Sequence, residues 1–400
     1  MRIPDLIHAT GGPRYTIALA VDALGTGLLR PFLLLYGIKV LSLSAPATGM
    51  AMTAGIVVGL AAMPALGQWL DRGARSAAVA AAMLVRVVGT ALLLAVPAGN
   101  LALFAAACLF LGVGNQAWPA AHAALVATVA EGRARDAALA ASRSLRNAAL
   151  GVGALIAMGA LAGGPSALRA VAAVTGVSYL AAAALARSVH VRAEPAPAAA
   201  TPSTAAPTTA NDPDPAPAAA PGLGTLLATN IIYVFCLNVP EIALPLVLVT
   251  QLHASPAWSA GIFVANTVLV VTLQVAVTVW MARFSRRSAL AIAGVILSVS
   301  YLGFLAATPL GSTWGAPAVA AVSVLCTLGE IVYAGTATAL VTAIAPPRAL
   351  GRALARFQLS TGFGLAVSPA AITSLAAAGP AALWGTLAAA TLASAAAVKR

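Results

Sequence analysis

Three carboxylic acids lie inside long apolar stretches of this sequence: Asp22, Glu241 and Glu330. A charged side chain is costly in such surroundings, so an acid retained there is by default functional. A carboxyl group that meets water first on one side and then on the other can carry a proton, and we predict this role for all three. For Asp22, a structural ion pair with Arg143 or Arg146 is an equally supported alternative. Glu330 has no evident cationic partner in its own half of the sequence and is the first choice as proton carrier.

Other polar side chains recur in the same apolar stretches, and we predict that they line a cavity for a small molecule. Hydrogen bonding between neighbouring helices is the alternative role for each of them. The set is Arg30, Asn115, Gln116, Arg146, Asn147, Asn238 and Gln274. For Arg86 a structural role is favoured. For His122 a packed, hydrogen-bonded ring is favoured over a proton relay.

The elements that must position these side chains are membrane-spanning helices. The 400 residues are 61% hydrophobic and only 8% charged, with a mean hydropathy of +0.95, so the chain lacks the polar surface that a water-soluble globule needs. About 20 helical residues cross a hydrocarbon core of about 30 Å, and the apolar runs have that length. They are too long and too uniform for barrel strands. We therefore predict an all-α membrane protein with twelve transmembrane helices, near residues 14–41, 50–68, 76–97, 101–129, 137–162, 167–187, 223–250, 258–282, 288–308, 316–344, 353–377 and 380–398.

The basic residues predict the orientation of these helices. Of the 22 Lys and Arg residues, 16 lie at the termini or beside loops that follow even-numbered spans. Cytoplasmic loops carry the excess of Lys and Arg, so both termini are expected in the cytoplasm. The net charge of +12 thus reflects topology, and nucleic-acid binding is not expected. An Ala-rich composition with Arg favoured over Lys is typical of a GC-rich bacterial genome, which predicts the plasma (inner) membrane of a bacterium.

The chain divides into two related halves. We expect a six-helix bundle at 1–190, a disordered Pro- and Ala-rich cytoplasmic linker at 191–222, and a second six-helix bundle at 223–400. At a shift of 215 residues, "ALVATVAEGRARDAALA" (124–140) and "ALVTAIAPPRALGRALA" (339–355) share nine of 17 positions. Two parallel six-helix repeats with a site between them are a transporter architecture.

One polar stretch, "GQWLDRGARS" at 67–76, interrupts the apolar sequence between the second and third spans. It resembles the signature of the major facilitator superfamily at the same loop: a Gly, three residues, Asp-Arg, one residue, then Gly-Arg-Arg. Ala74 and Ser76 replace the second Gly and the last Arg. The resemblance implies that a cluster of four residues keeps the cytoplasmic side closed while the protein faces outward. We assign this gating role to Gly67, Asp71, Arg72 and Arg75. Ordinary positive-inside anchoring is the alternative for the two arginines.

Two spans qualify the resemblance. "VDALGTGLLRPFLLLY" (21–36) is similar to the first span of drug-exporting members of the superfamily. In the fourth span, Cys108 stands four residues before Gly112, where those members often have an Arg linked to proton movement. Export by proton antiport is therefore favoured by one span and not by the other.

We predict a secondary transporter that works by alternating access, most concretely a proton-coupled exporter of small organic molecules. An uptake permease or uniporter for a sugar or metabolite is the alternative, and a membrane-embedded enzyme or sensor is a remote one. No Gly-Lys-Ser/Thr phosphate loop is present, and Cys108, Cys236 and Cys326 have no metal-ligand or paired spacing. We therefore expect no enzyme activity, no cofactor, no metal and no disulfide. The expected partners are a small-molecule substrate, protons and the lipid bilayer, and the expected state is a monomer.

Overall fold

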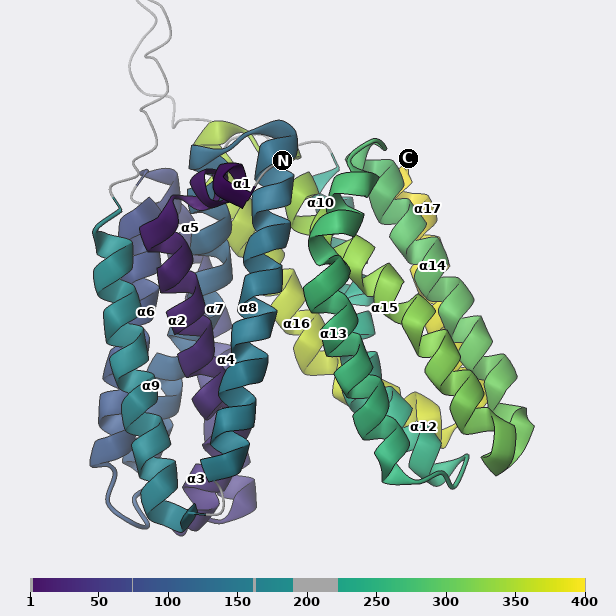
Figure 1. The fold of residues 1–400 in the computed structure, drawn as a ribbon, viewed down its shortest axis with the longest axis horizontal. Coiled ribbons are helices and arrows are strands. Elements are labelled where there is room, and N and C mark those ends of the chain that lie inside the picture. Colours follow the sequence, from purple (N-terminus) through teal and green to yellow (C-terminus); the bar gives the residue numbers. More distant parts are fainter. Residues whose placement is uncertain (1–2, 74, 161–162, 190–221, 400) are drawn as a thin grey trace, which may run out of the picture.

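The computed structural model describes residues 3–73, 75–160, 163–189 and 222–399, and within these ranges the chain forms helices and no strands. Figure 1 shows two helical bundles, one built from residues 3–189 and the other from 222–399. The bundles meet at the end of the molecule that carries both termini and splay apart at the opposite end. The linker predicted at 191–222 lies outside the described residues apart from Gly222, which directly precedes a helix.

The N-terminal bundle begins with a short helix that the hydropathy pattern does not predict, α1 (Ile3–Thr10), and continues with the predicted spans. Its other elements are α2 (Pro13–Leu29), η1 (Arg30–Phe32), α3 (Leu33–Lys39), α4 (Ala45–Ala61), α5 (Met63–Asp71), α6 (Arg75–Ala95), α7 (Leu101–Val129), α8 (Gly132–Ala160) and α9 (Gly164–Arg187).

The C-terminal bundle has more interruptions in its helices. Its elements are α10 (Leu223–Tyr233), α11 (Phe235–Asn238), the π-helix η3 (Val239–Ala243), α12 (Leu244–Thr250), α13 (Pro256–Met281), α14 (Arg286–Ala307), η4 (Thr308–Leu310), α15 (Gly311–Ile344), η5 (Pro347–Ala349), α16 (Leu350–Ala377), the π-helix η6 (Ala381–Gly385) and α17 (Thr386–Lys399).

These helices account for the predicted spans. Among the described residues, ten helices are long and apolar enough to cross a membrane, and α2 with α3, bent by 41°, makes an eleventh. The remaining long helix, α8, carries five charged side chains and packs against α13 and α15 of the other bundle. The two bundles repeat one packing pattern: α2 packs on α8 and α9 as α10 packs on α16 and α17, and α6 packs on α7 and α9 as α14 packs on α15 and α17. The fold is an all-α membrane architecture of two pseudo-symmetric bundles.

The first predicted span of each bundle contains an irregular segment. α2 gives way to a 3₁₀ turn at Arg30–Phe32, and α10–α12 contain a π-helix at Val239–Ala243 that includes Pro240. A proline removes one helical hydrogen bond and permits a bend, and π-bulges are frequent at functional sites. Pro245 is the second residue of α12, which follows this π-helix directly.

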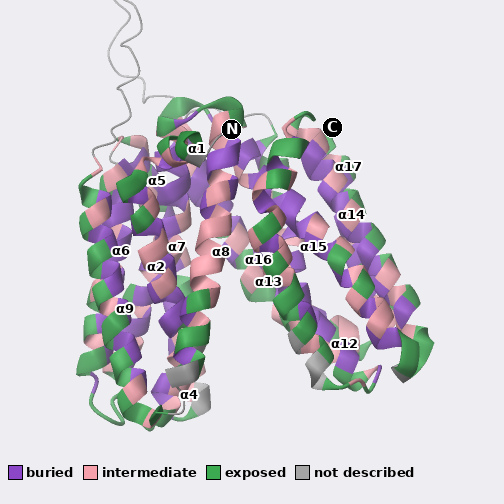
Figure 2. Cartoon of the chain, viewed as in Figure 1, coloured by how far each residue is buried: buried purple, intermediate pink, exposed green. Residues whose placement is uncertain are grey.

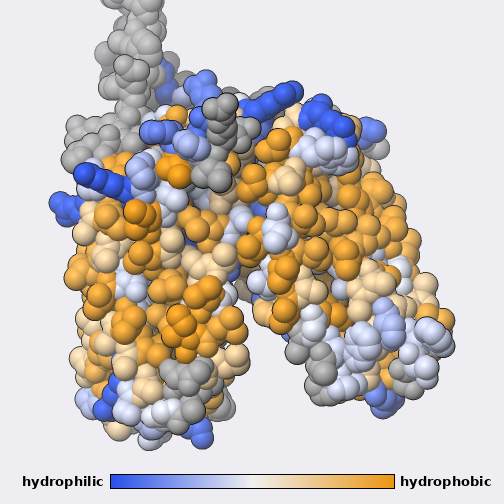
Figure 3. Space-filling view, viewed as in Figure 1, coloured by the Kyte–Doolittle hydropathy of each residue, from blue (hydrophilic) through white to orange (hydrophobic). Residues whose placement is uncertain are grey.

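The surface has the character of a lipid-facing protein. Buried residues run along the inside of each bundle in Figure 2, while many large apolar side chains remain exposed on the outside. In Figure 3 a broad apolar band covers the visible face of the molecule between two more polar ends. The same view shows a deep groove between the bundles, open at the end opposite the termini.

Candidate functional site

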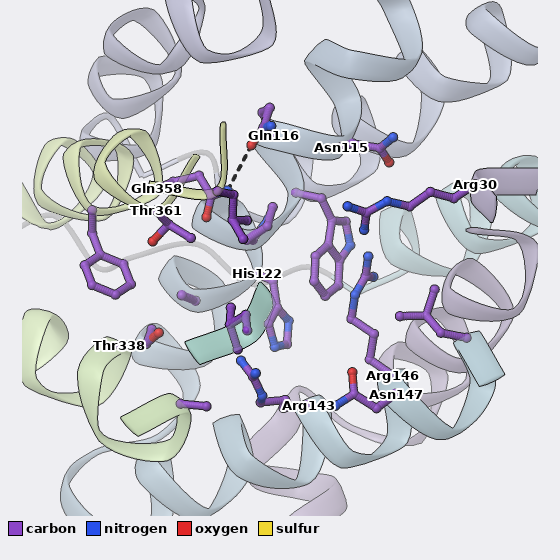
Figure 4. Close-up of a pocket in the computed structure, with 18 of the residues that line it drawn as sticks. Arg30, Asn115, Gln116, His122, Arg143, Arg146, Asn147, Thr338, Gln358 and Thr361 are labelled. Atoms are coloured by element: carbon purple, nitrogen blue, oxygen red, sulfur yellow. Dashed lines mark hydrogen bonds between the residues drawn. The ribbon is translucent and has the colours of Figure 1, made fainter. Parts of the chain in front are cut away.

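The main cavity lies between the two bundles and has a volume of about 470 Å³. Small-molecule sites have volumes of about 300–1,000 Å³. α7 and α8 line it from the N-terminal bundle, and α15 and α16 line it from the C-terminal bundle. Figure 4 shows side chains from both bundles pointing into the same space, and Gln358 donates across it to Gln116 at 3.0 Å.

The charged groups lining this cavity are basic. Arg30, Arg143 and Arg146 line it, and none of its described lining residues is Asp or Glu. Figure 4 shows Arg30 and Arg146 extending into one region, and the two like charges repel each other. The cavity is therefore an electropositive site between apolar walls.

Asp22 does not face the cavity. It is fully buried inside the N-terminal bundle, where Arg86 of α6 donates to one carboxylate oxygen at 2.5 Å and Arg146 of α8 donates to the other at 3.1 Å. Of the two partners that the sequence suggested, Arg146 takes part and Arg143 does not. The predicted structural role of Arg86 matches this position, and its guanidinium also lies 4.5 Å from the ring centroid of Tyr179.

An aromatic layer supports Arg146 from the cavity side. Its guanidinium carbon lies 4.0 Å from the ring centroid of Trp118, which stacks on His122 with 4.9 Å between ring centroids. His122 Nδ1 and the Tyr15 hydroxyl are 2.9 Å apart in a buried hydrogen bond. His122 is thus packed and hydrogen-bonded, as expected, although it also contributes to the cavity lining.

Glu330 lies next to the cavity, at the junction of the two bundles. It is buried in the middle of α15, and its carboxylate lies 3.8 Å from Arg143 of α8, so a cationic partner does exist but in the opposite half. Asn266 of α13 donates to the other oxygen at 3.0 Å. Arg143 itself lines the cavity, and so does Tyr333, one turn after Glu330. The acid is therefore connected to the cavity through Arg143.

Glu241, in contrast, is exposed. It belongs to the π-helix η3, is absent from the lining of the cavity, and interacts electrostatically with Arg30 of the opposite bundle. Of the three predicted proton sites, only Glu330 forms an ion pair that bridges the two halves within the described residues.

The predicted cavity residues divide into two groups. Arg30, Asn115, Gln116, Arg146 and Asn147 line the cavity. Asn238 and Gln274 do not: Asn238 bonds to the Ser368 hydroxyl, and Gln274 donates to the carbonyl of Ile331 at 3.2 Å. Both are buried and fill the alternative role, hydrogen bonding between helices.

Asp71 bridges the two bundles at the end where they meet, which we call the closed end. Its Oδ1 accepts from the backbone N–H groups of Gly351 at 2.6 Å and Arg352 at 3.3 Å, and its Oδ2 accepts from Arg352 Nε at 2.6 Å. These N–H groups belong to the first turn of α16, whose own N-cap residue, Ala349, has no side chain to accept them. Asp71 thus caps α16 from the other half and faces the positive end of its dipole.

The other residues of the "GQWLDRGARS" stretch have different surroundings. A Cβ on Gly67 would lie 2.9 Å from the Cα of Arg352, so only glycine permits this approach of α5 to α16. Arg75 donates to the Ala124 carbonyl at 3.3 Å and to Thr128 at 2.5 Å, both near the C-terminus of α7 in the same half. Arg72 is exposed.

A second bridge at the closed end was not predicted from the sequence. Arg286, at the start of α14, donates from Nε at 3.1 Å and from Nη2 at 2.7 Å to Asp136 Oδ2 near the start of α8. At the repeat shift of 215 residues, Asp71 corresponds to Arg286 and Asp136 to Gly351, so the two bridges occupy equivalent places. That correspondence was the signal that could have found the second bridge.

Comparison with known proteins identifies the family of this fold. The profile described as Major Facilitator Superfamily matches residues 15–316. The chain belongs to this superfamily. It is therefore a multi-pass membrane transporter and not an enzyme. A search of curated proteins by sequence finds no match.

Solved structures of other superfamily transporters share the fold at low sequence identity. The human organic anion transporter MFSD10 (TETRAN) has a TM-score of 0.73 and 14% identity, covering 99% of this chain and 100% of that one. An outward-facing bacterial homologue of the iron transporter ferroportin has a TM-score of 0.74 and 13% identity over 96% of both chains. The transporter FucP in its outward conformation has a TM-score of 0.69 and 14% identity, covering 97% and 98%.

Proposed function

We propose that this superfamily member is a proton-coupled secondary transporter of small organic molecules, with Glu330 as the proton carrier. The observation that carries the proposal is the ion pair between Glu330 and Arg143, because it joins the two bundles beside the cavity. Alternating access moves the bundles relative to each other, so this contact changes between the two states. A proton on Glu330 removes its negative charge and weakens the contact, which couples protonation to the movement.

Few charged groups act on Glu330. Arg143 is its partner across the interface and Asn266 is its hydrogen-bond donor, while Glu241 is the other acid that acts on it. The remaining titratable groups that interact with it are Cys236, Cys326, Tyr301 and Tyr333. Arg143 is thus the one cation that acts on Glu330 among the described residues, and its release is the expected effect of protonation.

Export is the first candidate direction. The similarity of residues 21–36 to the first span of drug exporters supports it, and so does the signature stretch at 67–76. With both termini in the cytoplasm, the groove in Figure 3 opens to the outside, which is the state in which an exporter releases its substrate and takes up a proton.

Uptake is the second candidate, and one observation favours it: the charged lining of the cavity is basic. A substrate attracted by these arginines and a proton on Glu330 would favour each other's binding, because the proton frees Arg143. Cooperative binding of substrate and proton is the basis of symport. Among structures that share this fold, FucP and XylE are proton symporters of fucose and xylose.

A flux measurement tests both the coupling and the direction. The full chain is reconstituted into vesicles, and a panel of small anions, neutral compounds and amines is assayed with and without an imposed pH gradient. Glu330→Gln keeps the shape of the side chain but cannot titrate, so we expect it to abolish gradient-driven flux while the protein still folds and binds. Glu131→Gln, an exposed acid before α8, is the matched control. If Glu330→Gln still shows gradient-driven flux, Glu330 is not the proton carrier, and either another acid carries the proton or transport is not coupled to protons.

A further inference from the structure

We propose that the cavity selects a small organic monoanion, a carboxylate carried on an apolar body. This inference rests on the proposed function and names the substrate class of the same cavity. Its first support is the lining itself, in which the charged side chains Arg30, Arg143 and Arg146 are all basic. An amine would meet basic side chains there and no acid among the described lining residues, and like-charge contacts disfavour a ligand.

The charge balance around the cavity points to a single negative charge on the ligand. The acids that interact with these arginines lie behind the walls and do not cancel them completely. Asp22 serves two guanidinium groups, Glu330 lies 3.8 Å from one, and Glu241 acts on another. With Glu330 ionised, four cations therefore face three anions, and one positive charge remains for a monoanion. The cations are Arg30, Arg86, Arg143 and Arg146.

The Arg143 side chain gives a second support. It lines the cavity, it is 34% exposed, and its Nη2 lies 3.8 Å from the Glu330 carboxylate, which is beyond hydrogen-bonding distance. Its guanidinium is therefore open to an acceptor on a ligand, and a carboxylate offers about four acceptor positions in the plane that guanidinium groups recognise.

The rest of the lining describes the remainder of the ligand. Arg30 and Arg146 converge in one region in Figure 4, while apolar side chains cover other parts of the wall. These are Leu33, Met52, Ile56, Leu111, Leu150 and Leu237. A compact polyanion such as an inorganic phosphate would leave this apolar surface uncovered. A monocarboxylate with a hydrocarbon or aromatic body covers it and places its charge between the arginines.

Matched probes separate charge from shape. The full-length protein in detergent is titrated with 4-phenylbutyrate, 4-phenylbutyramide and 4-phenylbutylamine, and then with a panel of other monocarboxylates and their amides. Thermal stabilisation and tryptophan fluorescence report binding. We expect a carboxylate to bind about tenfold or more tightly than its amide, and the amine not to bind, because hydrogen bonds between charged groups are the strong ones.

Arg30→Gln tests the site with little risk to folding, because Arg30 is exposed and forms no ion pair within the described residues. We expect this variant to bind the carboxylate and its amide within about twofold of each other. Arg187→Gln, an exposed arginine in the last turn of α9, is the matched control and should keep the full preference.

Two results would overturn the proposal. One is a panel in which no carboxylate binds more tightly than its amide. The other is an Arg30→Gln variant with an unchanged preference for carboxylates. Flux into vesicles distinguishes this proposal from the proposed function. If the pH gradient drives transport of an amide or an amine, the selectivity for anions is wrong, while proton-coupled transport is still supported.

Discussion

At the scale of single residues, the structure separates two acids that look alike in the sequence. Asp22 and Glu330 both lie in apolar helices, yet Asp22 has both oxygens held by arginines of its own bundle, and Glu330 has one loose partner in the other bundle. A pair inside one rigid bundle persists through a cycle of bundle movement, while a pair between bundles does not. This difference favours a structural role for Asp22 and supports the coupling role that we propose for Glu330.

Replacing Asp22 therefore tests stability. Asp22→Asn leaves Arg86 fully buried without a counter-ion, and removing one partner of a buried pair costs about 3–5 kcal/mol. We expect a marked drop in the unfolding temperature of the purified protein. Glu131→Gln should unfold at the wild-type temperature. If Asp22→Asn is as stable as wild type but its transport no longer responds to a pH gradient, Asp22 carries a proton and its role is not structural.

At the scale of helices, the two bridges at the closed end make separate contributions. Asp71 caps the first turn of α16 and pairs with Arg352, whereas Asp136 pairs with Arg286 and caps nothing in the other bundle. The two ion pairs are similarly buried, so the helix cap, whose loss typically costs about 1 kcal/mol, is what Asp71 contributes in addition. Asp71 is thus the stronger of the two contacts.

The labelling rate of a cavity cysteine measures this difference. In a variant without the native cysteines, Thr338→Cys places a thiol in the cavity lining. Asp71→Asn should raise its labelling from the cytoplasmic side more than Asp136→Asn does, and the double variant should exceed both. Unchanged labelling in Asp71→Asn would reduce the "GQWLDRGARS" stretch to a topology signal.

A charge exchange tests the second bridge directly. Asp136→Arg alone places two arginines together and should slow transport. Combining it with Arg286→Asp restores opposite charges across the same contact, so transport should recover in part. Flux assays of the two single variants and the double variant form a double-mutant cycle. If the double variant loses as much flux as the two single variants combined, the Asp136–Arg286 bridge has no role in transport.

The helices were largely predictable from the sequence, and the contacts between them were not. Hydropathy placed the span at 101–129 with the same bounds as α7, because a run of about 20 or more apolar residues is typical of a membrane-spanning helix. The partner of Asp22 on α6 was missed because the rotation of one helix against another is set by packing of small residues. α1 was missed because its eight residues are too few to give a span signal.

At the scale of the whole molecule, orientation remains the prediction on which the export and uptake directions depend. Sixteen of the 22 basic residues lie at the termini or beside loops that follow even-numbered spans, and the termini lie at the end where the bundles meet. That end and both termini are therefore expected in the cytoplasm. A reporter that is active only in the cytoplasm, fused after Arg400, should be active. A silent reporter, together with an active periplasmic one at the same position, would reverse the orientation and exchange the two directions.

The two bridges also determine how the halves would recognise each other if they were made as separate polypeptides. Both acids, Asp71 and Asp136, belong to the N-terminal half, and both of their arginines, Arg286 and Arg352, belong to the C-terminal half. Two copies of the same half would bring acid against acid or arginine against arginine. Co-expressed fragments 1–190 and 223–400 are therefore expected to form mixed pairs and not self-pairs, without any covalent connection between them.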